Sequence, residues 1–233
     1  MKRLCYFIIT GIAISVICSC KKSNTNKGLS SINIVNATTG VSSVVINFSD
    51  TAIPYYLNQD SITYGAYRQY GIPSGANPIV IVASSDTLKS LWKGTFNTTT
   101  GAIYSFYLSG TGSTIDTTMA RDILPIYADS SAGVRFINLS AGAKALTINL
   151  QGNTPDQKEF PDLGYKQISN FKGYVANGSA PNYTFEIRDE ATGDLLTTVT
   201  WNYTVFKNTT MVIGGSTDPN STMPINAFPV NNF

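Results

Sequence analysis

The chain of 233 residues contains no histidine. Without an imidazole it cannot assemble a Ser-His-Asp or Cys-His nucleophilic system or a His-ligated zinc site, and it lacks the commonest general base near neutral pH. No Gly-rich loop ends in Gly-Lys-Ser or Gly-Lys-Thr, and no Asp-x-Asp-x-Asp-Gly calcium loop is present. These absences predict that the protein is not an enzyme and holds no metal and no cofactor.

Charge is also scarce in this chain. Charged residues make up 13% of it, and glutamate occurs only as Glu159, Glu186 and Glu190. Long helices would use more Glu, Lys, Ala and Leu, whereas the abundant Ser, Thr, Asn, Gly and Tyr suit turn-rich β-structure. Lys2 and Arg3 account for the net charge of +2, so the rest of the chain is balanced. A balanced chain gives no electrostatic reason to expect nucleic acid as a partner.

Cysteine is rare, and all three cysteines lie within the first twenty residues. Lys2 and Arg3 precede an apolar run over 4–17 that is too short to span a bilayer and is typical of a signal segment. The run ends in Ile17-Cys18-Ser19-Cys20, which resembles a bacterial lipobox. The resemblance implies a signal peptide over 1–19, a lipidated Cys20 that anchors the protein to the membrane, and a polar tether over 20–30. Since Cys5 and Cys18 leave with the signal, we expect no disulfide.

What is present is an internal repeat. The stretch 32–49 matches 134–151 at an offset of 102, pairing Asn36 with Asn138 and Asn47 with Asn149. At an offset of 105, the stretch 95–97 matches 200–202, and Gly110 matches Gly215. Three blocks in the same order indicate a duplication, and two copies are too few for a solenoid. Each copy should therefore be a small domain.

Within each copy the apolar residues alternate with period two, as Val44, Ile46 and Phe48 do. Short alternating runs bounded by Gly, Asn, Ser and Pro predict half-buried strands. We therefore expect an all-β protein with two tandem immunoglobulin-like antiparallel β-sandwich domains. The expected boundaries are a first repeat over 31–112, a linker over 113–131 that packs on repeat one, a second repeat over 132–216, and a tail over 217–233 that packs on the second repeat and adds an edge strand.

Four blocks of sequence carry a resemblance to a known family: VRFINLSAGAKALTINL, LGYKQISNF, YTFEIRDEATGDLL and TMVIGG. They resemble the exported family catalogued as domain of unknown function 4397, here in tandem copies. Its members in Bacteroidota are similar lipoproteins whose signal often ends in Ser-Cys-Lys-Lys, as this one does. The resemblance covers roughly 32–215 and implies the fold and the compartment. It brings no activity and no functional residue.

The residues after Cys20 bear on the leaflet. Lys21 and Lys22 follow it, and the first acid is Asp50. Lipoproteins of Bacteroidota that reach the cell surface tend to carry acids just after the cysteine, and no inner-membrane retention aspartate is present. We therefore expect an outer-membrane protein facing the periplasm, with the cell surface as the alternative.

Aromatic side chains are the first binding candidates. Tyr64 and Tyr165 match between the repeats, as do Phe96 and Trp201, so we interpret these positions as core. Tyr55 and Tyr56 have no aromatic counterpart in the second copy, so we predict that they form an exposed pair that could stack on a sugar ring.

Acids and hydroxyls supply the remaining candidates. Carboxylates crowd the loops around 156–162 and 189–190, where they could form a calcium site or an acid/base pair, or simply solvate turns. Four Asp-Ser/Thr triplets resemble the O-glycosylation motif of exported Bacteroidota proteins, with Asp-Thr turn chemistry as the alternative. The candidate acceptors are Thr51, Ser61, Thr87 and Thr117.

Together these observations predict a non-catalytic cell-envelope lipoprotein that acts as a binding or structural module. A sharper alternative is a glycan-binding accessory of an outer-membrane uptake system, whose partner is a glycan or an envelope protein. A carboxylate-based hydrolase is the third alternative, since carboxylates are the only acid/base pair this inventory could supply.

Overall fold

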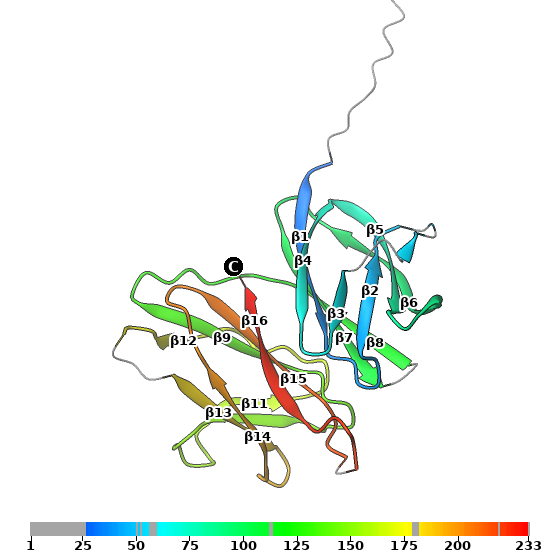
Figure 1. Cartoon of the computed structure of the whole chain (residues 1–233). Helices are drawn as coiled ribbons and strands as arrows, with labels where there is room; N and C mark the ends of the chain where they lie inside the picture. The colour runs from blue at the N-terminus through cyan, green and yellow to red at the C-terminus, as the bar shows by residue number, and fades with distance from the viewer. Residues whose placement is uncertain are drawn as a thin grey trace, which may run out of the picture.

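The computed structural model describes residues 27–49, 51, 53–55, 60–111, 114–178, 182–218 and 220–232. The predicted signal peptide, Cys20 and Tyr56 lie outside these residues. The described chain is all-β and forms two sandwich-like units that lie side by side (Figure 1). Within the part that the structure describes, there is no helix long and apolar enough to cross a membrane.

The first sandwich consists of two four-stranded sheets, in the orders β4-β1-β7-β8 and β3-β2-β5-β6. Their apolar faces close on one core, which includes Ile34, Ile46, Ile81 and Phe106. Strands β1 and β7 run parallel, whereas the other pairs of these two sheets are antiparallel. The strands are β1 (Leu29–Asn36), β2 (Ser43–Asn47), β3 (Ser61–Thr63), β4 (Tyr67–Pro73), β5 (Gly75–Ala83), β6 (Asp86–Thr98), β7 (Ile103–Thr111) and β8 (Thr114–Arg121).

The second sandwich repeats this topology with the orders β12-β9-β15-β16 and β11-β10-β13-β14. Its core centres on Phe136, Phe185 and Trp201, whose rings contact one another or their neighbours edge to face or tilted. Strands β9 and β15 are its parallel pair. The strands are β9 (Ser131–Asn138), β10 (Leu146–Leu150), β11 (Lys158–Leu163), β12 (Lys172–Val175), β13 (Tyr183–Asp189), β14 (Leu195–Trp201), β15 (Asn208–Gly214) and β16 (Asn226–Asn232).

Matched asparagines make matched hydrogen bonds in the two sandwiches. Asn36 donates through Nδ2 to the carbonyl of Ile62 at 2.9 Å, and its Oδ1 accepts from the backbone of Thr38 at 3.0 Å. Asn138 likewise donates to the carbonyl of Leu163 at 3.0 Å. Each amide is fully buried and ties the end of one sheet's central strand to the edge strand of the other sheet, so the same device closes both sandwiches.

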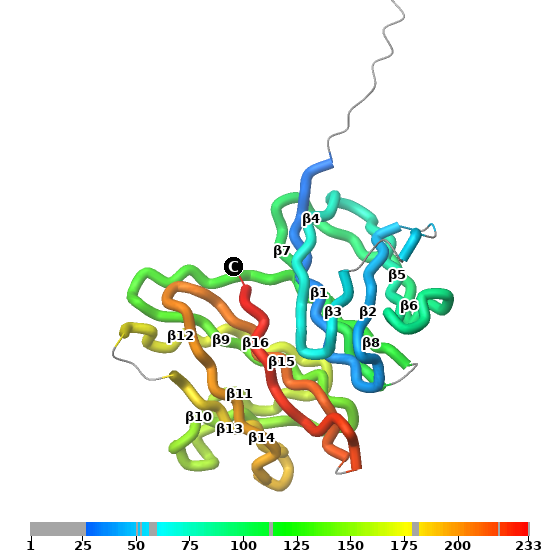
Figure 2. Tube along the Cα trace, in the orientation of Figure 1, coloured from blue at the N-terminus to red at the C-terminus, as the bar shows by residue number. Residues whose placement is uncertain are grey.

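The sandwiches pack against each other through the outer faces of the β1 and β9 sheets, which Figure 2 shows facing one another. Strand β1 is buried on both faces, because Ile32 and Ile34 enter the core while Val35 enters this interface. The apolar part of the interface consists of Val35, Ala37, Tyr107, Ile137, Leu139, Val212 and Val230. Three pairs of these occupy matched positions in the repeat, so both copies contribute the same patch.

Polar contacts at the interface are reciprocal as well. The Tyr64 hydroxyl donates to Asn226 Oδ1 on β16 at 2.9 Å. In the other direction, Lys166 donates to Asp116 Oδ1 on β8 at 2.8 Å, and the Tyr165 hydroxyl lies 3.0 Å from Ser109 Oγ. Contacts exchanged between the same surfaces of two units define an isologous, two-fold interface. The chain is therefore an internal quasi-dimer, and Tyr64 and Tyr165 lie at this interface and not in a sandwich core.

Two expected boundaries change in the structure. The segment expected as a linker contains β8, which adds an edge strand to the first sandwich by pairing with β7. Asp122 is still hydrogen-bonded to Ile103 of the first sandwich, but the segment beyond it contacts the second sandwich: Tyr127 lies over Gly133 and Gly173, where a Cβ atom would collide with its ring. Ile123 and Ile126 are 82% and 96% exposed, so the apolar run does not bury itself on repeat one.

The tail after 216 contains β16, which pairs antiparallel with β15 along its length. Val230 is fully buried and Phe228 contacts Tyr64, so the tail contributes to the interface between the sandwiches as well as to the second sandwich. In topology β8 and β16 are equivalent strands, since each forms the edge of the sheet that its copy contributes to the interface.

Candidate functional site

Tyr55 lines a shallow pocket of about 250 Å³ on the outer face of the β2-β5-β6 sheet. We call this the Tyr55 pocket. It is smaller than most small-molecule sites, which suits one sugar ring better than an extended ligand. The residues that line it are Asn47, Thr51, Tyr55, Val80, Val82, Thr87, Leu88, Ser90 and Lys93.

Asn47, at the end of β2, organises the loop that carries Tyr55. Its buried amide accepts from the backbone of Ser49 at 2.8 Å and donates to the carbonyl of Thr51 at 3.0 Å. The same Nδ2 lies 3.5 Å from the Tyr55 hydroxyl. These contacts hold the half-buried Tyr55 ring at the pocket, so the aromatic wall is fixed by a backbone-bound asparagine.

The floor and rim of the pocket differ in chemistry. Val80 and Val82 lie opposite Asn47 and Val45 in the β2–β5 register and form an apolar floor. Thr87, Ser90 and Lys93 supply hydroxyl and ammonium groups at the rim, and Leu88 is 99% exposed. An aromatic ring beside amide and hydroxyl groups suits a sugar, which offers an apolar ring face and polar edges.

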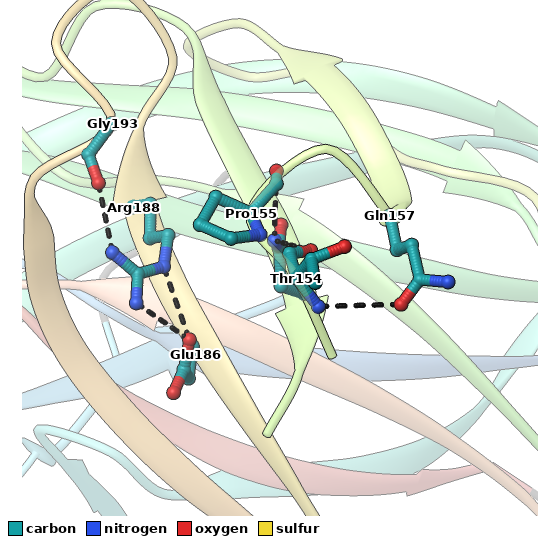
Figure 3. A network of polar contacts seen from close by, with 7 residues as sticks. Thr154, Pro155, Gln157, Glu186, Arg188 and Gly193 are labelled. Atoms are coloured by element: carbon teal, nitrogen blue, oxygen red, sulfur yellow. Dashed lines mark hydrogen bonds and ion pairs between the residues drawn. The ribbon is translucent and has the colours of Figure 1, made fainter. Parts of the chain in front are cut away.

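The same face of the second sandwich is filled by an ion pair. Glu186 and Arg188 take the register positions of Val80 and Val82, opposite Asn149 and Thr147. Arg188 donates to Glu186 Oε2 at 2.8 and 3.0 Å and to the carbonyl of Gly193 at 2.8 Å (Figure 3). The neighbouring loop is closed by Thr154, whose backbone donates to Gln157 Oε1 at 3.2 Å (Figure 3). The apolar floor and the aromatic wall are therefore features of the first copy.

The carboxylates of the segments 156–162 and 189–190 form structural contacts and do not converge. Glu159 pairs with Lys172 and accepts from the Tyr174 hydroxyl at 2.7 Å. Burial raises the pKa of Glu159, but the hydrogen bonds from Lys172 and Tyr174 outweigh it, so the pKa lies below its usual value. Glu190 pairs with Lys158.

Other acids stabilise turns or stay in solvent. Asp189 accepts from the backbones of Ala191 and Thr192 at 2.9 and 3.1 Å, which caps the β13–β14 hairpin. A hydrogen bond from Thr154 lowers the pKa of the fully exposed Asp156. Across the described residues, no group of three or more Cys, Asp or Glu side chains could hold a metal ion.

The four candidate O-glycosylation acceptors lie in different places. Thr51 is exposed, and Thr87 is partly exposed in the β5–β6 hairpin; both line the Tyr55 pocket. Ser61 lies in β3 and Thr117 in β8, where each is partly buried. Asp86 accepts from the backbone of Leu88, as the turn interpretation expects, whereas Asp116 accepts from the backbone of Thr117 within strand β8. A glycan on Thr51 or Thr87 would cover the pocket.

A buried charged cluster at the interface was not predicted from the sequence. Arg135 and Asp122 form an ion pair between the sandwiches, and both residues are less than 8% exposed. Arg135 also donates to Thr210 Oγ1 at 2.9 Å and lies 4.5 Å from the centroid of the Phe171 ring, while Ser105 donates to Asp122 at 2.7 Å. An arginine inside the apolar run VRFIN was the available signal, because a charged residue in a buried strand requires a partner.

Tyr107 completes this cluster. Its hydroxyl accepts from Arg135 at 3.4 Å, and the side chain is fully buried. Burial raises the pKa of the Tyr107 phenol, although the nearby positive charge of Arg135 opposes the rise. The phenol therefore stays protonated, and the cluster stabilises the interface without a titratable nucleophile.

Comparison with known proteins yields a weak structural likeness. No family model matches the chain, and no curated protein matches it. Among solved structures, a Bacteroides ovatus protein described as a "putative adhesin" is similar over 88% of this chain and 95% of its own, with 9% identity and a TM-score of 0.23. A likeness of this size carries no functional argument.

Proposed function

We propose that the protein is a non-catalytic binding module of the bacterial cell envelope, held at the outer membrane by lipid on Cys20 and facing the periplasm. The signal segment and the lipobox resemblance support the anchor, and the structure leaves that part of the chain undescribed. The structural support is that the two sandwiches pack against each other through a buried interface, so that their outer surfaces keep a fixed arrangement. The acids that could have served catalysis are engaged in ion pairs and turn caps.

The sharper proposal is that the Tyr55 pocket binds a glycan. The observation that carries it is the difference between the copies. In the first copy Val80, Val82 and Tyr55 shape a pocket, whereas Glu186 and Arg188 fill the matching face of the second sandwich. A duplicated face needs no apolar, aromatic-walled hollow for folding, since the second copy folds without one. A ligand is a physical reason for the hollow.

A glycan array with the fragment 24–233 tests this proposal, because every described strand lies within that fragment. We expect selective binding, and the double substitution Tyr55→Ala with Tyr56→Ala should weaken it at least tenfold. Stacking of a base on an aromatic side chain contributes about 1–3 kcal/mol in nucleic-acid complexes, and a sugar would present a similar ring face to these tyrosines. Tyr165→Ala, which removes a ring of the second copy, is the control. An array without any binding would leave only the structural role.

The anchor has its own test. Cys20→Ala should leave the protein unprocessed or soluble, because a chain without the acylated cysteine has no lipid to hold it. Fractionation with the membrane at the mature mass would contradict the anchor and leave the Tyr55 pocket unaffected.

A further inference from the structure

The quasi-two-fold axis relates two ends of the interface that differ. At one end the ion pair between Arg135 and Asp122 is buried. The repeat offset of 102 places Asn33 at the position of Arg135, and the β7–β8 and β15–β16 registers place Asn232 at the position of Asp122. In agreement, Ser105 donates to Asp122 and Thr210 donates to Asn232 Oδ1 at 2.6 Å.

The Asn33 end is polar, buried and incompletely paired. Asn33 is 1% exposed and lies beside Gln69 in the β1–β4 register. Neither amide atom of Asn33 has a hydrogen-bond partner among the described residues, and neither does Nδ2 of Asn232, which is 2% exposed. An unpaired buried polar group is destabilising, and the Arg135 end pairs the matching groups.

A cleft of about 340 Å³ opens at this end, between the two sandwiches. Junctions between domains are preferred places for small-molecule sites, and this volume lies at the small end of their range. We call it the junction cleft. Tyr67 and Gln69 of the first sandwich form one wall, and the second sandwich supplies Thr204, Lys207, Thr209, Asn231 and Asn232.

The donors of the junction cleft define the chemistry of its ligand. Among the described residues that line it, Lys207 is the one cation and none is a carboxylate. Gln69, Asn231 and Asn232 offer amides, which can donate to and accept from hydroxyl groups. Tyr67, 36% exposed, offers an aromatic face.

We propose that the junction cleft binds an acidic saccharide, with the sugar carboxylate at Lys207, its hydroxyls at the amides, and its ring face on Tyr67. This site is separate from the Tyr55 pocket, which lies on the other sheet of the first sandwich. It requires both copies, because each sandwich supplies one of its walls.

Isothermal titration of the full chain in detergent micelles with digalacturonate tests the proposal. We expect saturable binding that Lys207→Met weakens at least tenfold, because hydrogen bonds to charged groups contribute about 1.5–3 kcal/mol. Tyr67→Ala should weaken it about fivefold or more. Lys144→Met removes an exposed lysine outside the cleft and should leave binding unchanged, as should Tyr55→Ala, which separates this site from the proposed glycan pocket.

Lys207→Met and Tyr67→Ala decide the proposal, because both residues lie at the surface. Binding of digalacturonate at parental strength by Lys207→Met would overturn the proposal. So would the absence of heat with digalacturonate, equal binding of its neutral methyl ester, or binding of a polyglutamate peptide in its place.

Discussion

At one end of the interface between the sandwiches, Arg135 and Asp122 are buried together and paired; at the other end, the matching positions hold Asn33 and Asn232. The backbone arrangement is the same at both ends, and so is the hydroxyl that donates to Asp122 or to Asn232. The difference lies in how the buried polar groups are satisfied. The charged end pairs them across the interface, whereas both amide atoms of Asn33 and Nδ2 of Asn232 have no hydrogen-bond partner among the described residues.

The largest effect is expected from breaking the charged end. Asp122→Ala should lower the free energy of unfolding by about 3–5 kcal/mol, because it leaves the Arg135 guanidinium buried without its counter-charge. Urea unfolding followed by tryptophan fluorescence measures the loss. The exposed pair Arg68–Asp60 is the control, and Arg68→Ala should cost less than about 1 kcal/mol.

The amide end should respond in the opposite way. Asn33→Leu removes two unpaired polar atoms and keeps the number and branching of the side-chain heavy atoms, so the free energy of unfolding should stay level or rise. If Asn33→Leu and Asp122→Ala were equally destabilising, the two ends would be energetically alike and the comparison would fail.

A smaller effect is expected where the copies agree. Asn36→Leu and Asn138→Leu each remove a buried amide that joins the two sheets of a sandwich, and each should cost about 1–3 kcal/mol. Because the hydrogen bonds match, the two losses should agree within about 1 kcal/mol in the same urea measurement. A marked inequality would show that one sandwich depends on this device and the other does not.

The smallest effect concerns acid, and it distinguishes the second sandwich from the first. The pKa of Glu159 lies below its unfolded value, so its contribution to stability is complete above about pH 4.5 and is lost as the pH falls through the folded pKa. The wild type should therefore exceed Glu159→Gln in urea midpoint at pH 7, and the difference should shrink at pH 3. Lys172→Met, which removes the partner, should flatten the same dependence. A constant difference between pH 7 and pH 3 would contradict it.

Sequence alone reached the all-β sandwich fold because local alternation and the repeat both depend on residues close in the chain. Val44, Ile46 and Phe48 show the period-two pattern directly, and Asn36 and Asn138 marked the repeat. The roles of β8 and β16 were harder to read, since their faces are partly polar and their pairing partners are set by the sheet order.

The candidate site was reached only in part. The lack of a repeat partner singled out Tyr55, and the structure places that ring at a pocket. The floor at Val80 and Val82 could not be read from the sequence, because strand register decides which residues share a face. The junction cleft could not be predicted from the sequence, since its walls come from β4 and from the end of the chain, more than a hundred residues apart.

The two copies share one polypeptide, and this decides what evolution could do with their interface. In a symmetric homodimer every substitution occurs twice, so an arginine that replaced Asn33 at one end would appear at both. Fusion of the copies lifts that restriction and also makes their pairing intramolecular, and therefore independent of protein concentration. One end of the interface could thus acquire an ion pair while the symmetry-related end acquired different residues, which an assembly of identical subunits cannot achieve.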